Sequence, residues 1–197
     1  MSWGRRGVGV AQVFIFILAA VSFSLIMIFG YKAISSFVSS GEGVQLVQFK
    51  TDLESSIKKI YTEYGSVREE RYKLPSGFQQ ICFVNLEYSP DSPGEKDQII
   101  TSLKKENFRA GVALEEAYSA QKEGKDSSLG YEKVDENVFL APLREGLTQI
   151  KVYRISIGDY SNPEGKELPY LCIKVDSGSF SLILEGKGDR TKIYHKS

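Results

Sequence analysis

The stretch Val13-Phe-Ile-Phe-Ile-Leu-Ala-Ala-Val-Ser-Phe-Ser-Leu-Ile-Met-Ile-Phe29 decides how the rest of the chain is organised. No charged residue falls between Gly7 and Tyr31. This stretch is long enough to span a membrane, because about 20 apolar residues cross the ~30 Å hydrocarbon core of a bilayer. Trp3 and Tyr31 flank the stretch, where interfacial aromatic residues are common. The sequence therefore predicts a transmembrane helix over residues 8–31, with the lipid bilayer as its partner.

The charges beside this helix bear on its orientation. Arg5 and Arg6 precede it and Lys32 and Lys50 follow it, so the basic side chains at its two ends tie. The positive-inside rule counts Lys and Arg close to the membrane, and the two arginines are adjacent to each other there. We therefore expect residues 1–7 to be a cytoplasmic basic segment and everything after Lys32 to be extracytoplasmic.

A cleaved secretory signal is the alternative interpretation of the same stretch. The apolar core of such a signal has roughly 7–15 residues and is followed by a cleavage site of small residues. The segment Ala33-Ile-Ser35 fits such a site loosely. The greater length of the apolar run favours an anchor that is retained.

Charge and length limit the kind of domain that the membrane segment can carry. The chain has 197 residues with 25 basic and 25 acidic side chains, and its formal net charge is zero. From Lys32 onward there are 23 bases and 25 acids, a net charge of −2. A chain of this length suits one ordinary domain, and this balance provides no basic field for nucleic acid. We expect a near-neutral domain tied to a membrane, with no nucleic-acid partner.

The region after the membrane segment divides into a linker and a helix. Ser35 to Gly43 is rich in Ser and Gly, which predicts a hinge over residues 32–43. Apolar residues then recur every three or four positions, at Leu46, Phe49, Leu53, Ile57, Ile60 and Tyr64. This spacing predicts an amphipathic helix over residues 44–64. We expect it to cover one face of a sheet, and packing between copies of the chain is the alternative.

Strand signals dominate the remainder, apart from a helical stretch over residues 95–125. Residues 66–74 are charged and predict an edge strand. Alternating or continuous apolar runs between turn residues predict strands at 78–88, 138–140, 149–157, 170–175, 180–184 and 190–194. Short turns separate the last three, which predicts a C-terminal three-stranded meander. Residues 44–197 are therefore expected to form one extracytoplasmic α+β domain with a mostly antiparallel sheet.

The chain has two cysteines, Cys82 and Cys172, and each lies in the middle of a predicted apolar strand. In an oxidising compartment such a pair is a good candidate for a disulfide. The bond would close a loop of about 90 residues and would stabilise the fold by on the order of 4 kcal/mol in the chain-entropy model. Two unpaired buried thiols are the alternative.

Few residues suit catalysis or metal binding. There is no Cys-x-x-Cys or Cys-x-x-His spacing, and the single histidine, His195, is expected to be solvated. The adjacent pairs Glu69-Glu70 and Glu115-Glu116 do not face each other on a strand or a helix. We predict no catalytic residue, no cofactor, no metal site and no enzymatic activity. A membrane-bound enzyme with an unidentified carboxylate site is the remaining alternative.

The N-terminal region, about 30 residues, resembles the signal region of archaeal type IV pilin-like proteins, which carry class III signals. The basic pair Arg5-Arg6 is followed by Gly7 and then by the apolar run. The resemblance implies cleavage after Gly7, retention of the helix and assembly of subunits through it. Gln12 would be the fifth mature residue, where bacterial pilins place a glutamate, and Gly9 at the second mature position is a further departure.

The sequence therefore predicts a single-pass membrane protein whose extracytoplasmic domain acts in binding or envelope assembly. Its expected partners besides lipid are further copies of itself or an envelope protein. A pilin-like subunit that assembles through its N-terminal helix is the alternative function.

Overall fold

The computed structural model describes residues 10–74, 76–142, 149–162, 165–175 and 178–195, and it leaves the side chains of residues 10–12 and 32–42 undescribed. The chain divides into two compact units, Met1–Val44 and Gln45–Ser197. The boundary between them falls directly after the Ser/Gly-rich segment. The first unit contains the apolar stretch and the second contains both sheets.

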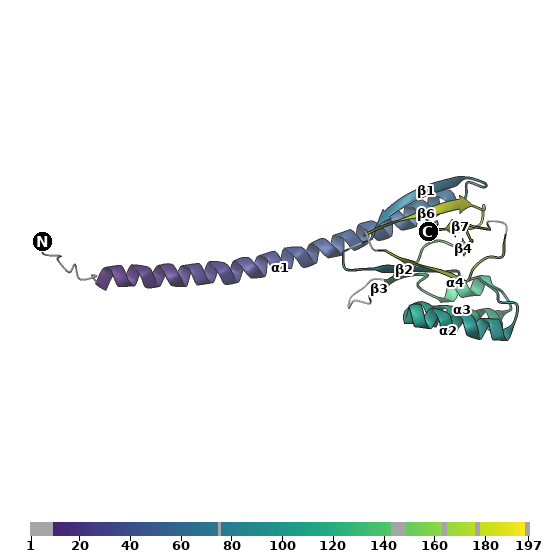
Figure 1. Ribbon diagram of the computed structural model, residues 1–197, viewed down its shortest axis with the longest axis horizontal. Coiled ribbons are helices and arrows are strands. Elements are labelled where there is room, and N and C mark those ends of the chain that lie inside the picture. Colours follow the sequence, from purple (N-terminus) through teal and green to yellow (C-terminus); the bar gives the residue numbers. More distant parts are fainter. Residues whose placement is uncertain (1–9, 75, 143–148, 163–164, 176–177, 196–197) are drawn as a thin grey trace, which may run out of the picture. The chain divides into compact units, whose positions relative to one another are not determined.

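Helix α1 runs from Val10 to Ile60 without interruption (Figure 1). Its backbone is helical through residues 32–43, where the sequence predicts a hinge. Serine and glycine weaken a helix by roughly 0.5–1 kcal/mol each relative to alanine, whereas proline removes a hydrogen bond and clashes with the preceding turn. The first proline of the chain is Pro75. The Ser/Gly segment therefore contains no residue that must end the helix.

The last third of α1 belongs to the second unit and has the apolar face that the sequence predicts. The side chains of this face are fully or almost fully buried at Phe49, Leu53, Ile57 and Ile60. Tyr64 does not continue the face, since the helix ends at Ile60 and Tyr64 is 82% exposed. The following Gly65 has a φ of 76°, which L side chains rarely adopt, and its N–H donates to the Gly186 carbonyl.

Within the described residues, seven strands form two sheets, and most neighbouring strands are antiparallel. The four-stranded sheet has the order β1-β6-β7-β4, and β4 pairs with β7 in parallel. The three-stranded sheet has the order β3-β2-β5. The strand bounds are β1 Val67–Lys73, β2 Gln80–Val84, β3 Val138–Ala141, β4 Ile155–Ile157, β5 Tyr170–Lys174, β6 Ser179–Gly186 and β7 Thr191–Tyr194. The predicted α+β class is confirmed, and so is the charged strand β1 at a sheet edge.

The predicted C-terminal meander forms only in part. Strands β6 and β7 pair as an antiparallel hairpin, but β5 pairs with β2 in the other sheet. Proximity in sequence favours pairing of β5 with β6. In the structure, Cys172 of β5 is bonded to Cys82 of β2, and β5 pairs with that strand instead. A short connection between two strands therefore does not ensure that they pair with each other, because the chain changes sheets between Lys174 and Ser179.

Three helices follow β2: α2 Pro93–Glu106, α3 Phe108–Gly124 and α4 Ser128–Lys133. Ser92 caps α2, since its hydroxyl accepts from the N–H of Glu95 at 3.2 Å, and Pro93 occupies the first turn. Asn107 separates α2 from α3, and its side chain caps α3 by accepting from the N–H of Ala110 at 3.1 Å.

Two apolar cores lie on opposite faces of the three-stranded sheet. Successive residues of β2 alternate between them, because Ile81 and Phe83 join one core while Cys82 and Val84 join the other. The first core lies between the last third of α1 and the inner faces of both sheets. The second lies between the three-stranded sheet and the helices α2 and α3, which cover its other face (Figure 1).

The predicted strand at residues 149–157 is mostly irregular, and only Ile155–Ile157 is a strand. A single buried side chain takes the place of a neighbouring strand. The Asn137 amide donates to the Val152 carbonyl at 3.1 Å, and its oxygen accepts from the Val152 N–H at 2.8 Å. Val152 therefore has its backbone groups satisfied inside the core without a sheet ladder.

Candidate functional site

The apolar stretch is uncovered in the first unit. The span Val13–Tyr31 is long and apolar enough to cross a membrane, and no part of it is buried. Its few polar groups are partly satisfied within the helix, since the Ser24 hydroxyl donates to the Ala20 carbonyl at 2.9 Å. At 1.5 Å per residue, these 19 residues extend about 28 Å, close to the hydrocarbon thickness of a bilayer.

The residues of the proposed processing signal are only partly described. Arg5, Arg6 and Gly7 lie outside the described residues. Gln12 lies in the first turn of α1, and its side chain is not described. The cleavage after Gly7 thus remains a prediction from sequence.

The two cysteines are joined by a disulfide, as the sequence predicts, with an S–S distance of 2.02 Å and 90 residues between them. Cys82 of β2 lies directly opposite Cys172 of β5. The Asn85 N–H donates to the Pro169 carbonyl in the same register, and hydrogen-bonded pairs alternate along antiparallel strands. The cysteines therefore occupy a non-hydrogen-bonded pair, where side chains approach closest, and their Cα atoms are 4.0 Å apart.

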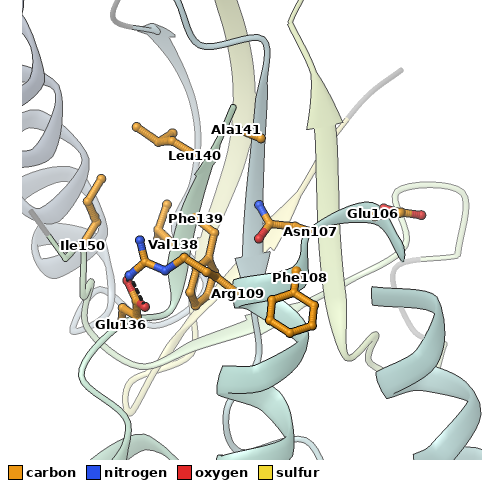
Figure 2. Close-up of a pocket in the computed structure, with 10 residues that line it drawn as sticks. All are labelled: Glu106, Asn107, Phe108, Arg109, Glu136, Val138, Phe139, Leu140, Ala141 and Ile150. Atoms are coloured by element: carbon orange, nitrogen blue, oxygen red, sulfur yellow. Dashed lines mark hydrogen bonds and ion pairs between the residues drawn. The ribbon is translucent and has the colours of Figure 1, made fainter. Parts of the chain in front are cut away.

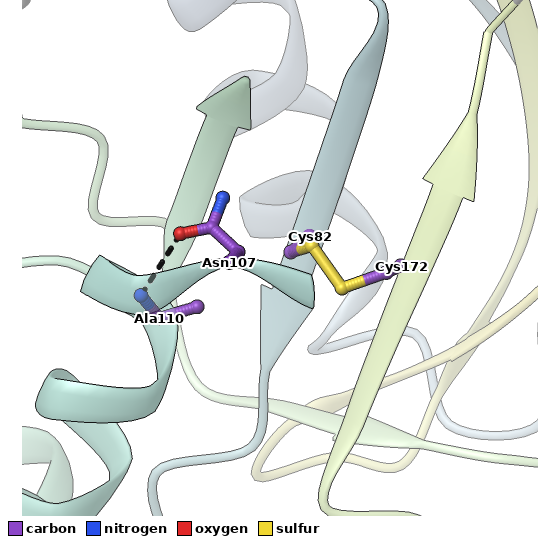
Figure 3. The surroundings of a disulfide bond; sticks show 4 residues. All are labelled: Cys82, Asn107, Ala110 and Cys172. Carbon is purple, nitrogen blue, oxygen red and sulfur yellow. Dashed lines mark hydrogen bonds between the residues drawn. A yellow bond between two sulfur atoms is a disulfide. The ribbon is translucent and has the colours of Figure 1, made fainter. Parts of the chain in front are cut away.

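The disulfide lies beside the start of α3. Figure 3 shows Asn107 and Ala110 next to the sulfur atoms. Cys82 is fully buried and Cys172 packs against the same core, which α3 completes with Ala110 and Leu114. The bond thus ties the middle strand of the sheet to its edge strand β5, directly beneath a helix.

A groove opens between β3 and the N-terminus of α3. A cavity of about 230 Å³ is lined by the outer edge of β3 together with Asn107, Phe108 and Arg109 (Figure 2). The Arg109 guanidinium is bonded to both carboxylate oxygens of Glu136, at 2.5 and 2.6 Å. Phe108, the first residue of α3, is 68% exposed.

A second cavity of about 240 Å³ adjoins the first and shares Phe108, Arg109 and Glu136 with it. Val112, one turn after Phe108, and Lys133 contribute to its wall. None of these groove residues was predicted from the sequence. The sequence signal that could have indicated the groove is Phe108, an apolar residue directly after the helix cap Asn107. The first turn of a helix usually carries polar residues.

A buried carboxylate lies where three segments converge. Glu87 follows β2 and its side chain is only 5% exposed. Its carboxylate is 2.9 Å from the Arg154 guanidinium and 3.8 Å from that of Arg190. Burial raises the pKa of Glu87, and the two arginines oppose that rise. The cluster joins the end of β2 to segments that precede β4 and β7, so we interpret it as a structural clasp.

A second charged cluster ties the loop before β5 to the start of α2. The Lys166 ammonium is bonded to Asp91 at 2.5 Å and to Glu95 at 3.0 Å. These hydrogen bonds, with one to Tyr88, raise the pKa of Lys166, and the bond from Lys166 is the largest cause that lowers the pKa of Glu95. All of these polar groups are bonded to one another, so the cluster fixes the loop without presenting a vacant ligand position.

His195 is held in place. Its Nδ1 donates to the Ser181 carbonyl at 3.0 Å and the ring is part-buried, so the expectation of a solvated histidine is wrong. Within the described parts of the chain, no three His, Cys, Asp or Glu side chains are grouped so that they could hold a metal ion.

Three features thus remain to which a function can be attached: the exposed apolar span, the disulfide and the β3–α3 groove. The span and the cysteines are visible in the sequence, and the groove requires the fold. No protein family matches this chain, and neither does any curated protein or solved structure. Its function must therefore be inferred from its own residues.

Proposed function

We propose that the chain is a single-pass membrane-anchored protein whose extracytoplasmic α+β domain acts in binding or envelope assembly. The observation that carries the proposal is the span Val13–Tyr31, which is apolar and unburied along its whole length. Large apolar residues are usually buried, and an exposed apolar surface of this size marks contact with lipid or protein. A bilayer satisfies that requirement without any further partner.

The second unit supports the same proposal. Residues 45–197 contain both cores and both sheets, so the domain buries its apolar residues without help from the span. The proposed extracytoplasmic location draws support from Arg5 and Arg6 before the span and from the Cys82–Cys172 disulfide. Structural disulfides persist mainly in oxidising compartments.

Extraction of native membranes at alkaline pH with carbonate tests the anchor. We expect the full chain to remain in the membrane pellet. The double substitution Leu18→Lys and Leu25→Lys should release it, because a charged residue at the centre of a span opposes insertion by roughly 2.5–3.5 kcal/mol. Val47→Lys, which changes an exposed apolar residue of the same helix outside the span, is the matched control and should leave the chain in the pellet. Release of the unchanged chain would contradict the anchor.

A pilin-like subunit is the second candidate, and the continuity of α1 favours it. One helix extends from Val10 in the apolar segment to Ile60 in the core of the domain, and assembly through such a helix would join copies of the chain. Intact mass measured on protein from native membranes separates the candidates. A chain that starts at Val8 supports the pilin-like subunit, and an intact Met1 would contradict cleavage after Gly7.

A further inference from the structure

The two adjoining cavities form one surface feature, which we call the β3–α3 groove. They share Phe108, Arg109 and Glu136, and each is open to solvent along the seam between β3 and the first turns of α3. Figure 2 shows Phe108 at the start of α3, with Val138, Phe139 and Leu140 following one another along β3. The groove therefore lies between β3 and the first turns of α3, whose N-terminus is capped by Asn107.

The walls of the groove are apolar at their centre. Phe108 is largely exposed, and Val112 lies one turn further along the same face of α3. On the β3 side the lining comes from Val138, Leu140 and Ile150, whose side chains are buried in the core on the α1 face of the sheet, and from Phe139. Aromatic residues are enriched in protein interfaces. An exposed phenylalanine on a capped helix beside a cavity is therefore a candidate contact residue.

The charges around the groove are predominantly negative. Four carboxylates line the two cavities against two cations, a net charge of −2. Arg109 is neutralised by its bonds to Glu136. Among the residues that the structure describes, no ion pair engages the remaining carboxylates, which belong to Glu106, Glu116 and Asp135. Complementary charge selects partners and steers their approach, so this rim favours a cationic partner.

We infer that the β3–α3 groove binds a segment of a partner protein in which one bulky apolar side chain is flanked by lysine or arginine. The apolar side chain covers Phe108 and Val112, and the basic residues face Glu106 and Glu116. This inference rests on the binding role proposed above and names the class of partner. It does not depend on which side of the membrane the domain faces.

Peptide binding to the full chain in lipid nanodiscs tests the inference. The probe is a short labelled peptide with one phenylalanine between two lysines, and the comparison peptide has glutamates in place of the lysines. We expect the lysine peptide to bind more tightly, with an affinity that falls as salt rises. Phe108→Ser should abolish this binding, and Val67→Ser, which removes an exposed apolar residue from β1, should leave it unchanged.

A charge reversal makes the test more specific. Glu116→Lys should shift the preference toward the glutamate peptide, whereas Glu123→Lys, on the same helix outside the groove, should not. Equal affinity for the two peptides, no detectable binding, or a loss with Val67→Ser as large as that with Phe108→Ser would overturn the inference. So would Phe108-dependent binding of anionic lipid vesicles in place of peptide. Carbonate extraction of the same variants reports on the anchor separately, so a failure of the groove is distinguishable from a failure of the membrane proposal.

Discussion

Asn137 shows how one side chain can replace an element of secondary structure. The alternation of Ile150, Val152, Ile155 and Ile157 in the sequence predicts a strand, and these residues are indeed buried. The backbone at Val152, however, is bonded to the Asn137 side chain. Burial was therefore predictable from the apolar pattern, whereas the hydrogen-bond partner was not, because it comes from a single polar residue outside the pattern.

Replacing Asn137 tests this role. Asn137→Ala should lower the free energy of unfolding by on the order of 2 kcal/mol, because it leaves the buried N–H of Val152 without a partner, whereas the Val152 carbonyl keeps its bond from the Tyr131 hydroxyl at 3.2 Å. The control Asn162→Ala changes an exposed asparagine and should alter stability by less than about 0.5 kcal/mol. Urea unfolding of both variants in detergent measures the difference. Equal stabilities would show that the amide of Asn137 is dispensable.

The disulfide makes a second prediction about single residues. The double variant Cys82→Ala and Cys172→Ala should lose about 4 kcal/mol of stability, since the bond closes a loop of 90 residues in the unfolded chain. Reducing agent should destabilise the unchanged protein and leave the double variant unaffected. Alkylation of unfolded, unreduced protein followed by mass measurement checks the bond itself. Modification of both thiols under those conditions would rule it out.

Burial of Tyr72 predicts a loss of stability at high pH. Burial raises the pKa of Tyr72 to about 12, whereas an unfolded tyrosine ionises near pH 10. The stability from this group is therefore complete below pH 10 and is lost as the pH rises toward 12. Between pH 8 and pH 11, the free energy of unfolding should fall by about 1 kcal/mol less in Tyr72→Phe than in the unchanged protein. Tyr64→Phe, at an exposed tyrosine, is the control, and an identical loss in all three proteins would contradict the assignment.

At the scale of elements, α1 combines two patterns that the sequence shows separately. The uncharged run and the amphipathic spacing were both predictable, but the helical segment between them was not, because Ser and Gly are equally common in linkers. The parallel pair β4–β7 was likewise out of reach, and the proximity of β5 to β2 was indicated only by the predicted disulfide. Such contacts join residues far apart in sequence, and no local pattern encodes them.

The last third of α1 should be an integral part of the domain. Ile57→Ala should cost about 2–5 kcal/mol, because Ile57 is fully buried between the two sheets. Val47→Ala, at a position on the same helix that is 61% exposed, should change stability by less than about 0.5 kcal/mol. Urea unfolding measures both. A small effect at Ile57 would mean that the helix only rests against the domain.

At the scale of the whole molecule, we propose a membrane anchor joined to a domain that faces away from the cytoplasm. The apolar helical span Val13–Tyr31 was predictable, because an uncharged apolar run of about this length favours a helix that crosses a bilayer. The groove was not, because Phe108, Glu136 and Leu140 come together only through the fold. The proposed anchor would limit where the groove can meet a partner, since a single span would hold the domain at one side of the membrane.

Labelling of intact cells tests this arrangement most directly. Glu123→Cys adds one thiol at an exposed position of α3, and the two native cysteines are engaged in their disulfide. A maleimide that cannot cross membranes should label this variant in intact cells, to the same extent as after lysis, while the unchanged protein stays unlabelled. Labelling of the variant only after lysis would place the domain in the cytoplasm and contradict the proposed arrangement.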